Sequence, residues 1–267
     1  MHVQAFRSGL LYNNCRSIFA LYSHHMNSVK PPFRSMSSTT DQMQALKKYT
    51  ACDIADALLK LKVPGSGFLS DLQLYPPGSD VSGKEVTIAP ASTVEFRPKS
   101  SNHTPSAGTR NDANIPVGKH WVDLTESETI VVMSQPDGQR NAVLGGIMAL
   151  RMKVLGAKAV VVHGRVRDMV ELGSTGLPIW ARGSSIVGAG AESIPHAIQV
   201  PLTLDGTEVN PGDLVFSDPT NGVVVIPKDK VNNVIEMLPK LVKADDRVKE
   251  DVEQGMSVQE AFKKHRG

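Results

Sequence analysis

Two short apolar segments on either side of a helix-forming stretch restrict the fold of this chain more than any other feature. Residues 128–133 read Glu-Thr-Ile-Val-Val-Met and residues 159–163 are rich in valine, which is typical of strands buried on both faces. Between them, residues 142–155 are rich in Leu, Met and Ala and are followed by Gly156, a common helix end. The pattern predicts a strand, a helix and a further strand inside an α/β domain.

The same reasoning predicts the other elements of the chain. Apolar residues at helical spacing over 41–62 predict a helix that breaks near Tyr49, with Thr50 and Asp53 capping a second one. Alternating or apolar runs between turn residues predict strands at 69–75, 84–90, 93–96, 179–182, 197–204, 214–217 and 223–226. Residues 100–117 form a predicted surface loop, and 228–241 and 244–266 form predicted helices. Without internal repeats, residues 41–267 are expected to form one domain.

Composition excludes several classes of function. The 267 residues carry a formal net charge of +2, and their basic residues are dispersed, so nucleic acid is not an expected partner. The two cysteines, Cys15 and Cys52, form no CxxC pair, which favours a reducing compartment. The longest apolar runs are far too short to span a bilayer, so no membrane association is expected.

The first 40 residues differ in composition from the rest. They contain no Asp or Glu, and their basic residues are spread among Ser, Leu, Phe and Tyr. A mitochondrial transit peptide has this composition, but so does a disordered extension, and Met26 or Met36 is an alternative start. Cytoplasm is therefore the expected location, with mitochondria as the alternative.

A glycine-rich helix start and an Arg-Asp pair form the candidate site. Gly145 and Gly146 precede the predicted helix, and the uncovered N–H groups of a helix start attract anions. Arg167 and Asp168 follow the strand at 159–163, at the edge where α/β sheets bind ligands. A guanidinium suits a carboxylate or an enolate oxygen, and a lone Asp suits a hydrated divalent cation. Close helix packing and a surface ion pair would explain the same residues without a function.

The motifs also carry a resemblance to a known family. The run GGIMALRMKVLGAKAVVVHGRVRD, followed by LPIWARG, PGDLVFSD and NGVVVIP, resembles the RraA-like family over residues 46–266, and its fungal branch most. Enzymes of that family are class II 4-hydroxy-4-methyl-2-oxoglutarate aldolases with secondary oxaloacetate decarboxylase activity. The resemblance implies an α/β/β/α sandwich of the swivelling-domain type, assembled as a homotrimer or homohexamer with active sites between subunits.

The resemblance also implies roles for individual residues. The backbone amides of one loop would hold the carboxylate of a small 2-oxo acid: Gly145, Gly146, Ile147 and Met148. Arg167 would bind the substrate, and Asp168 would be the protein ligand of Mg²⁺, Mn²⁺ or another divalent cation. The cation would act as a Lewis acid on the 2-oxo group, and a pyruvate enolate would be common to aldol cleavage and decarboxylation.

One position departs from the bacterial aldolases. Gly146 stands where they have an Asp thought to orient a water for proton transfer. The proton route therefore stays open between another group, a water held by the metal, slower turnover and a different substrate. Glu250 of a neighbouring subunit is one candidate. The loss of the Asp also leaves a second hypothesis, a non-catalytic regulator that binds other proteins.

Four further polar residues are weighed against structural roles. Arg182 lies in the Trp-Ala-Arg-Gly motif and either lines the pocket or bonds neighbouring groups. Asp213 and Asp218 lie in turns, where Asp side chains usually accept backbone N–H groups. His163, at a strand end, is expected to be a packed or hydrogen-bonded residue outside the site.

Overall fold

A computed structural model of the chain describes residues 38–77, 85–99 and 113–266. The extension predicted over residues 1–40 lies outside the described residues except for 38–40, and its role stays a prediction. Residues 100–112 of the predicted surface loop lie outside them as well. Within the described ranges, no helix is both long enough and apolar enough to cross a membrane.

The described residues form two α-helices early in the sequence, two in its middle and two near its end. The α-helices are α1 (Thr39–Leu46), α2 (Ala51–Lys60), α3 (Gly146–Val154), α4 (Met169–Thr175), α5 (Val231–Glu253) and α6 (Val258–His265). Short 3₁₀ helices are η1 (Pro64–Gly67), η2 (Trp121–Leu124) and η3 (Ala189–Ala191).

The strands form one large mixed sheet and one small hairpin. They are β1 (Phe68–Leu69), β2 (Gln73–Leu74), β3 (Thr87–Pro98), β4 (Ile130–Ser134), β5 (Ala159–Val166), β6 (Ile179–Ser184), β7 (Ser193–Ile198), β8 (Leu202–Leu204), β9 (Thr207–Val209), β10 (Leu214–Asp218) and β11 (Gly222–Ile226). The large sheet has the order β1-β11-β10-β3-β4-β5-β6-β2, with β7 also paired to β3, and β8 pairs with β9. The neighbours from β3 to β6 are parallel, whereas β10 and β11 pair antiparallel.

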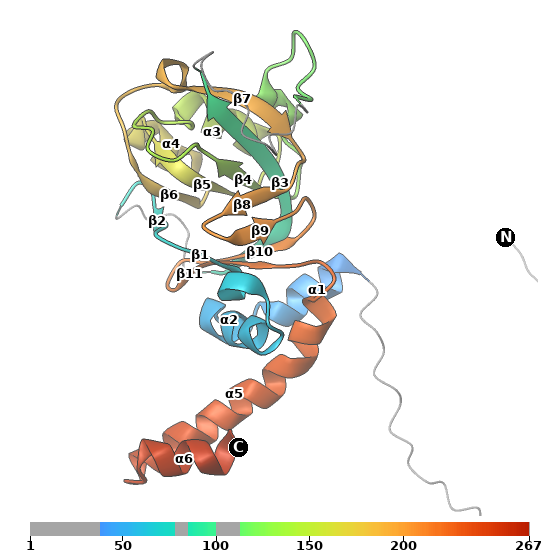
Figure 1. Cartoon of the computed structure of the whole chain (residues 1–267), viewed down its shortest axis with the longest axis vertical. Coiled ribbons are helices and arrows are strands. Elements are labelled where there is room, and N and C mark those ends of the chain that lie inside the picture. Colours follow the sequence, from blue (N-terminus) through green and yellow to red (C-terminus); the bar gives the residue numbers. More distant parts are fainter. Residues whose placement is uncertain (1–37, 78–84, 100–112, 267) are drawn as a thin grey trace, which may run out of the picture. The chain divides into compact units, whose positions relative to one another are not determined.

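The valines of β5 alternate between two separate cores, as side chains on successive strand residues must. Val160 and Val162 pack with Met152 of α3 and Leu172 of α4. Val161 faces the opposite side of the sheet and belongs to the cluster of buried residues that includes β10 and β11. The parallel strands therefore lie between a helical layer and a second layer of strands (Figure 1).

The antiparallel strands repeat this alternation on their own two faces. Val215 of β10 points into the core shared with the parallel strands. Phe216, the next residue, packs with Ile54 of α2 and Leu238 of α5 in a third core. Three cores thus separate helices, two layers of strands and helices again, and the predicted α/β/β/α sandwich is confirmed.

Strand β3 belongs to both strand layers. Its first residues pair with β10 up to Leu214 opposite Pro90, and from Ala91, opposite Ile130, it pairs with β4. The prediction of two strands separated at Pro90 is therefore wrong. Pro90 lies where the strand changes partners, so its missing N–H does not interrupt a continuous ladder.

The helices at the amino-terminal end follow the sequence prediction closely. The Thr50 hydroxyl accepts a hydrogen bond from the Asp53 N–H at 3.2 Å, and an Asp53 carboxylate oxygen accepts one from the Thr50 N–H at 2.8 Å. This reciprocal capping box starts α2 and separates it from α1, as expected.

The helices at the other end differ from the prediction. Helix α5 continues through Pro239 to Glu253, so the predicted break near residue 242 is wrong. The break lies where Gly255 adopts a positive φ of 91° and Ser257 caps α6. Helix α4 was not predicted, because a seven-residue helix containing Gly173 leaves little periodicity to read.

Candidate active site

The segment before α3 runs beside the end of β5. Leu144 forms a parallel bridge with Val166, and the Arg167 N–H donates a hydrogen bond to the Leu144 carbonyl at 3.0 Å. These contacts bring Gly145 against the side chains of Arg167 and Asp168. The two parts of the predicted site, distant in sequence by some twenty residues, therefore meet as expected.

Position 145 requires a glycine because a side chain there would collide with Asp168 and Arg167. Its backbone is extended, with φ −131°, so any residue could adopt its conformation. A β-carbon there would lie only 2.7 Å from an Asp168 carboxylate oxygen and 3.3 Å from the Arg167 Nε. The glycine therefore lets both charged side chains reach the start of α3.

Asp168 has an unusual backbone conformation. Its φ of 63° and ψ of 53° place it in the left-handed region, which costs a non-glycine residue roughly 1 kcal/mol. Its Oδ2 accepts a hydrogen bond from the Gly146 N–H at 3.2 Å and lies 3.4 Å from the Arg167 Nε. Its Oδ1 accepts no hydrogen bond from the described residues, so one oxygen of the carboxylate remains available to a ligand.

The start of α3 leaves backbone donors uncovered. Among the described residues, the N–H groups of Ile147 and Met148 have no acceptor, whereas the Ala149 N–H already donates to the Gly145 carbonyl at 3.0 Å. Both donors sit at the positive end of the helix dipole. They are suited to a carboxylate, with Arg167 beside them.

A cavity of about 140 Å³ joins these features. Its lining includes Gly145, Ile147, Met148, Arg167 and Asp168. The side chains of Arg167 and Asp168 are 42% and 37% exposed, so solvent and small ligands reach them. The sixth predicted residue is Gly146, which is buried and contributes its N–H to Asp168 rather than to the cavity wall.

The Asp168 carboxylate suits a hard divalent cation that keeps most of its waters. The described residues contain no group of three or more His, Cys, Asp or Glu side chains placed to hold an ion. Zn²⁺ sites usually need such a group, whereas Mg²⁺ often binds one or two carboxylates and keeps several waters. The partly exposed Asp168 carboxylate is therefore compatible with a hydrated Mg²⁺ or Mn²⁺.

Sequence reasoning missed Glu171 of α4, which contacts Gly146 at the start of α3 and is not itself among the residues that line the cavity. A β-carbon at Gly146 would overlap with a Glu171 carboxylate oxygen and would lie 2.8 Å from the Glu171 Cδ. Asp168 therefore contacts the N–H of Gly146 while Glu171 fills the space next to its α-carbon. Predicting α4 would have revealed this residue, because that helix places Glu171 one turn after Asp168.

A larger cavity of about 380 Å³ lies nearby, at the ends of β4, β5 and β6. It contains His163 and Arg182, but these side chains already share the carboxylate of Asp205, with His163 Nε2 at 3.1 Å. The hydrogen bond with His163 and the one from Ser70, aided by Arg182, hold the pKa of Asp205 below its usual value despite partial burial. We favour the smaller cavity as the site because uncovered backbone amides, a guanidinium and a carboxylate with a free oxygen meet there.

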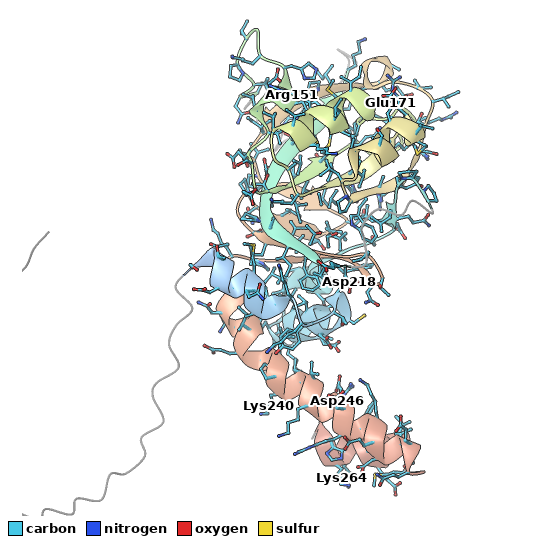
Figure 2. The ribbon with its side chains drawn as sticks, turned by 180° about the vertical axis from the view of Figure 1, so that it is seen from behind. Arg151, Glu171, Asp218, Lys240, Asp246 and Lys264 are labelled. Atoms are coloured by element: carbon cyan, nitrogen blue, oxygen red, sulfur yellow. The ribbon has the colours of Figure 1, made fainter. Side chains whose placement is uncertain are left out.

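The structural roles expected for three residues are confirmed. His163 is buried and hydrogen-bonded to Asp205. Asp213 accepts hydrogen bonds from the N–H groups of Asn210 and Lys228 at 2.7 and 2.9 Å. Asp218, labelled beside α2 in Figure 2, accepts one from the Ala51 N–H at 3.0 Å. Arg182 does not line the cavity that contains Arg167 and Asp168.

Comparisons with known proteins agree with this architecture. The chain is 28% identical over 223 residues to protein DlpA of Legionella pneumophila, covering 82% of this chain and 33% of that one. It is 33% identical over 137 residues to a Halalkalibacterium halodurans protein named provisionally as a 4-hydroxy-4-methyl-2-oxoglutarate aldolase, covering 51% and 63%. It therefore spans less than two thirds of the length of either relative.

A solved structure shows the same fold. Streptomyces coelicolor RraAS2, described as an unusual member of the RNase ES inhibitor RraA protein family, superposes with a TM-score of 0.60 and 21% identity. The likeness covers 82% of this chain and 98% of that one. The family model described as Aldolase/RraA matches residues 51–225, which include every residue of the candidate site. The chain belongs to the RraA-like family.

Proposed function

We propose that this chain is a divalent-metal-dependent lyase that breaks a carbon–carbon bond of a small 2-oxo acid through a pyruvate enolate. One observation carries the proposal: uncovered amides, a guanidinium and a carboxylate with a free oxygen meet in a single cavity. These three groups match the needs of a substrate carboxylate, a developing enolate and a hydrated divalent cation, respectively.

Each residue of the cavity has a distinct task in this proposal. The N–H groups of Ile147 and Met148 bind the substrate carboxylate, and Arg167 orients it and stabilises the charge that develops on the enolate oxygen. Asp168 holds the cation, which supplies Lewis-acid polarisation of the 2-oxo group when bound. The bond of Asp168 to the Gly146 N–H fixes its carboxylate beside the substrate amides.

The finer assignments rest on the motifs and on the names of relatives. We propose 4-hydroxy-4-methyl-2-oxoglutarate as the aldol substrate and oxaloacetate as the substrate of a secondary decarboxylation. The name of the Halalkalibacterium halodurans relative supports the first. We also propose a fungal-type member of the family, a homotrimer or homohexamer, and a cytoplasmic location with mitochondria as the alternative.

The test measures pyruvate release from both substrates with Mg²⁺, with Mn²⁺ and with a chelator. We expect metal-dependent turnover that is lost in Arg167→Ala and in Asp168→Asn, which keeps the shape of the side chain but removes its charge. Arg140→Ala is the matched control, because this exposed arginine lines only the larger cavity. Binding of Mn²⁺, followed by electron paramagnetic resonance, should be weakened in Asp168→Asn and unchanged in Arg140→Ala.

A second hypothesis is a non-catalytic regulator that binds other proteins. It is favoured by Gly146, which lacks the carboxylate present in the bacterial aldolases that the sequence resembles. If the wild-type protein releases no pyruvate from either substrate with any divalent metal, the lyase proposal fails and the regulator is preferred.

A further inference from the structure

Glu171 occupies a defined position next to the proposed site. Helix α4 starts directly after Asp168, so Glu171 lies three residues later on the same helical face. Its side chain packs against the α-carbon of Gly146, at the first turn of α3. Figure 2 shows Glu171 on α4, which packs beside α3.

The carboxylate of Glu171 is unoccupied by other interactions. Among the described residues, its oxygens take part in no hydrogen bond or ion pair, and only its backbone carbonyl accepts a bond, from the Ser174 hydroxyl at 2.7 Å. The residue is exposed, so its oxygens reach solvent. A glutamate that neither caps a helix nor pairs with a cation has both oxygens available as hydrogen-bond acceptors.

The proposed aldol cleavage needs such an acceptor. Breaking the C3–C4 bond requires loss of the proton from the 4-hydroxyl group, whose oxygen becomes a carbonyl as the bonding pair moves to the enolate. In the site, Oδ2 of Asp168 already accepts the Gly146 N–H, and the rest of that carboxylate is assigned to the cation. His163 is bonded to Asp205 in the other cavity. Within the described part of the chain, Glu171 is the remaining carboxylate beside the start of α3.

We propose that Glu171 accepts the 4-hydroxyl proton, directly or through one water, and passes it to solvent, from which C3 of the pyruvate enolate takes a proton in both reactions. The proton removed from oxygen equals the proton added to carbon, so one substrate gives two pyruvates and no other reactant is consumed. This inference rests on the proposed lyase function. The inference also explains Gly146, because the absence of a side chain there leaves the space that the Glu171 carboxylate occupies.

The two proposed reactions separate this role from a structural one. Oxaloacetate has no 4-hydroxyl proton to lose, because its C3–C4 bond breaks with departure of CO₂. In Glu171→Gln, which preserves size and shape, we expect kcat for aldol cleavage to fall by about 100-fold or more. Oxaloacetate decarboxylation and Mn²⁺ binding should change little. Glu208→Gln, on the exposed face of β9, is the matched control.

A second variant moves the carboxylate across the same contact. The double variant Gly146→Asp with Glu171→Gly removes the overlap between the two side chains and places a carboxylate on α3 instead of α4. We expect this double variant to recover part of the aldol cleavage lost in Glu171→Gln or Glu171→Gly.

The outcomes distinguish the inference from the function on which it rests. Absence of metal-dependent pyruvate release in the wild type would overturn both. Wild-type turnover with undiminished aldol cleavage in Glu171→Gln would overturn the role of Glu171 alone. An equal loss of both reactions in Glu171→Gln would also overturn it, because a proton acceptor for the 4-hydroxyl group cannot matter to decarboxylation.

Discussion

Gly146→Ala tests whether the Glu171 side chain really fills the space beside α3. Gly146 lies in the first turn of a helix and outside the left-handed region, so alanine there should stabilise the fold by about 0.5–1 kcal/mol on backbone grounds. The structure predicts the opposite sign. An alanine methyl would overlap with both the carboxylate oxygen and the β-carbon of Glu171.

The size of the destabilisation depends on which atom of Glu171 the added methyl group overlaps. The β-carbon of Glu171 is fixed to the backbone of α4, so no rotamer of the side chain removes the overlap, and α3 and α4 must move apart. Forcing an extra methyl into a packed contact costs about 1–3 kcal/mol, and an overlap between two β-carbons belongs to the upper half of that range, so subtracting the backbone gain leaves a net destabilisation of roughly 1–2.5 kcal/mol.

Urea unfolding of four proteins measures this effect: the wild type, Gly146→Ala, Glu171→Gly and the double variant, all at one protein concentration. In the Glu171→Gly background, Gly146→Ala should be neutral or stabilising, which gives a coupling free energy within the usual range of about 0.5–3 kcal/mol. Gly190→Ala is the control, because nothing lies within 4 Å of a β-carbon there. Equal destabilisation in both backgrounds, or stabilisation of the wild type, would refute the reasoning.

Three further predictions concern other parts of the chain. Burial alone would raise the pKa of Asp218, but hydrogen bonds led by the one from the Ala51 N–H lower it below the usual 3.8. Its contribution to stability is therefore complete above pH 3.8 and lost as pH falls through the lower folded value, so Asp218→Asn should destabilise the protein by about 1–3 kcal/mol at pH 7 and flatten its acid unfolding curve. Asp205→Asn removes the charged partner of His163 and should lower the melting temperature while leaving pyruvate release intact; loss of turnover with an unchanged fold would show that the larger cavity belongs to the active site. Pro239→Ala restores a backbone donor inside α5 and should stabilise the fold by at least about 1 kcal/mol in urea unfolding, a result that an unchanged midpoint would contradict.

The sequence predicted the parts of the fold that depend on local pattern. The valines of β5 and the Thr50–Asp53 cap act within a few residues, so their spacing alone defined a strand and a helix start. Pro90 misled the prediction, because whether a proline ends a strand depends on the strands with which it pairs. Those partners are distant in sequence and leave no local signal.

The candidate site was likewise predictable from the sequence only in part. Gly145, Arg167 and Asp168 were predictable, because a glycine-rich helix start and a charged strand end each have recognisable chemistry. The left-handed backbone of Asp168 and the packing of Glu171 against Gly146 were not. Both arise from how α4 leaves β5, which is a property of the folded domain.

Strand β3 has a consequence for how the domain is made. Its second half pairs with β4, whereas its first half pairs with β10, which begins only at Leu214. On the ribosome, every strand that frames the candidate site is therefore synthesised before the partner of residues 87–90 exists. The first half of β3 remains an unsatisfied edge until then, and edges of this kind are prone to pair with other chains. Slowing translation between β6 and β10 is thus expected to increase aggregation of the nascent protein.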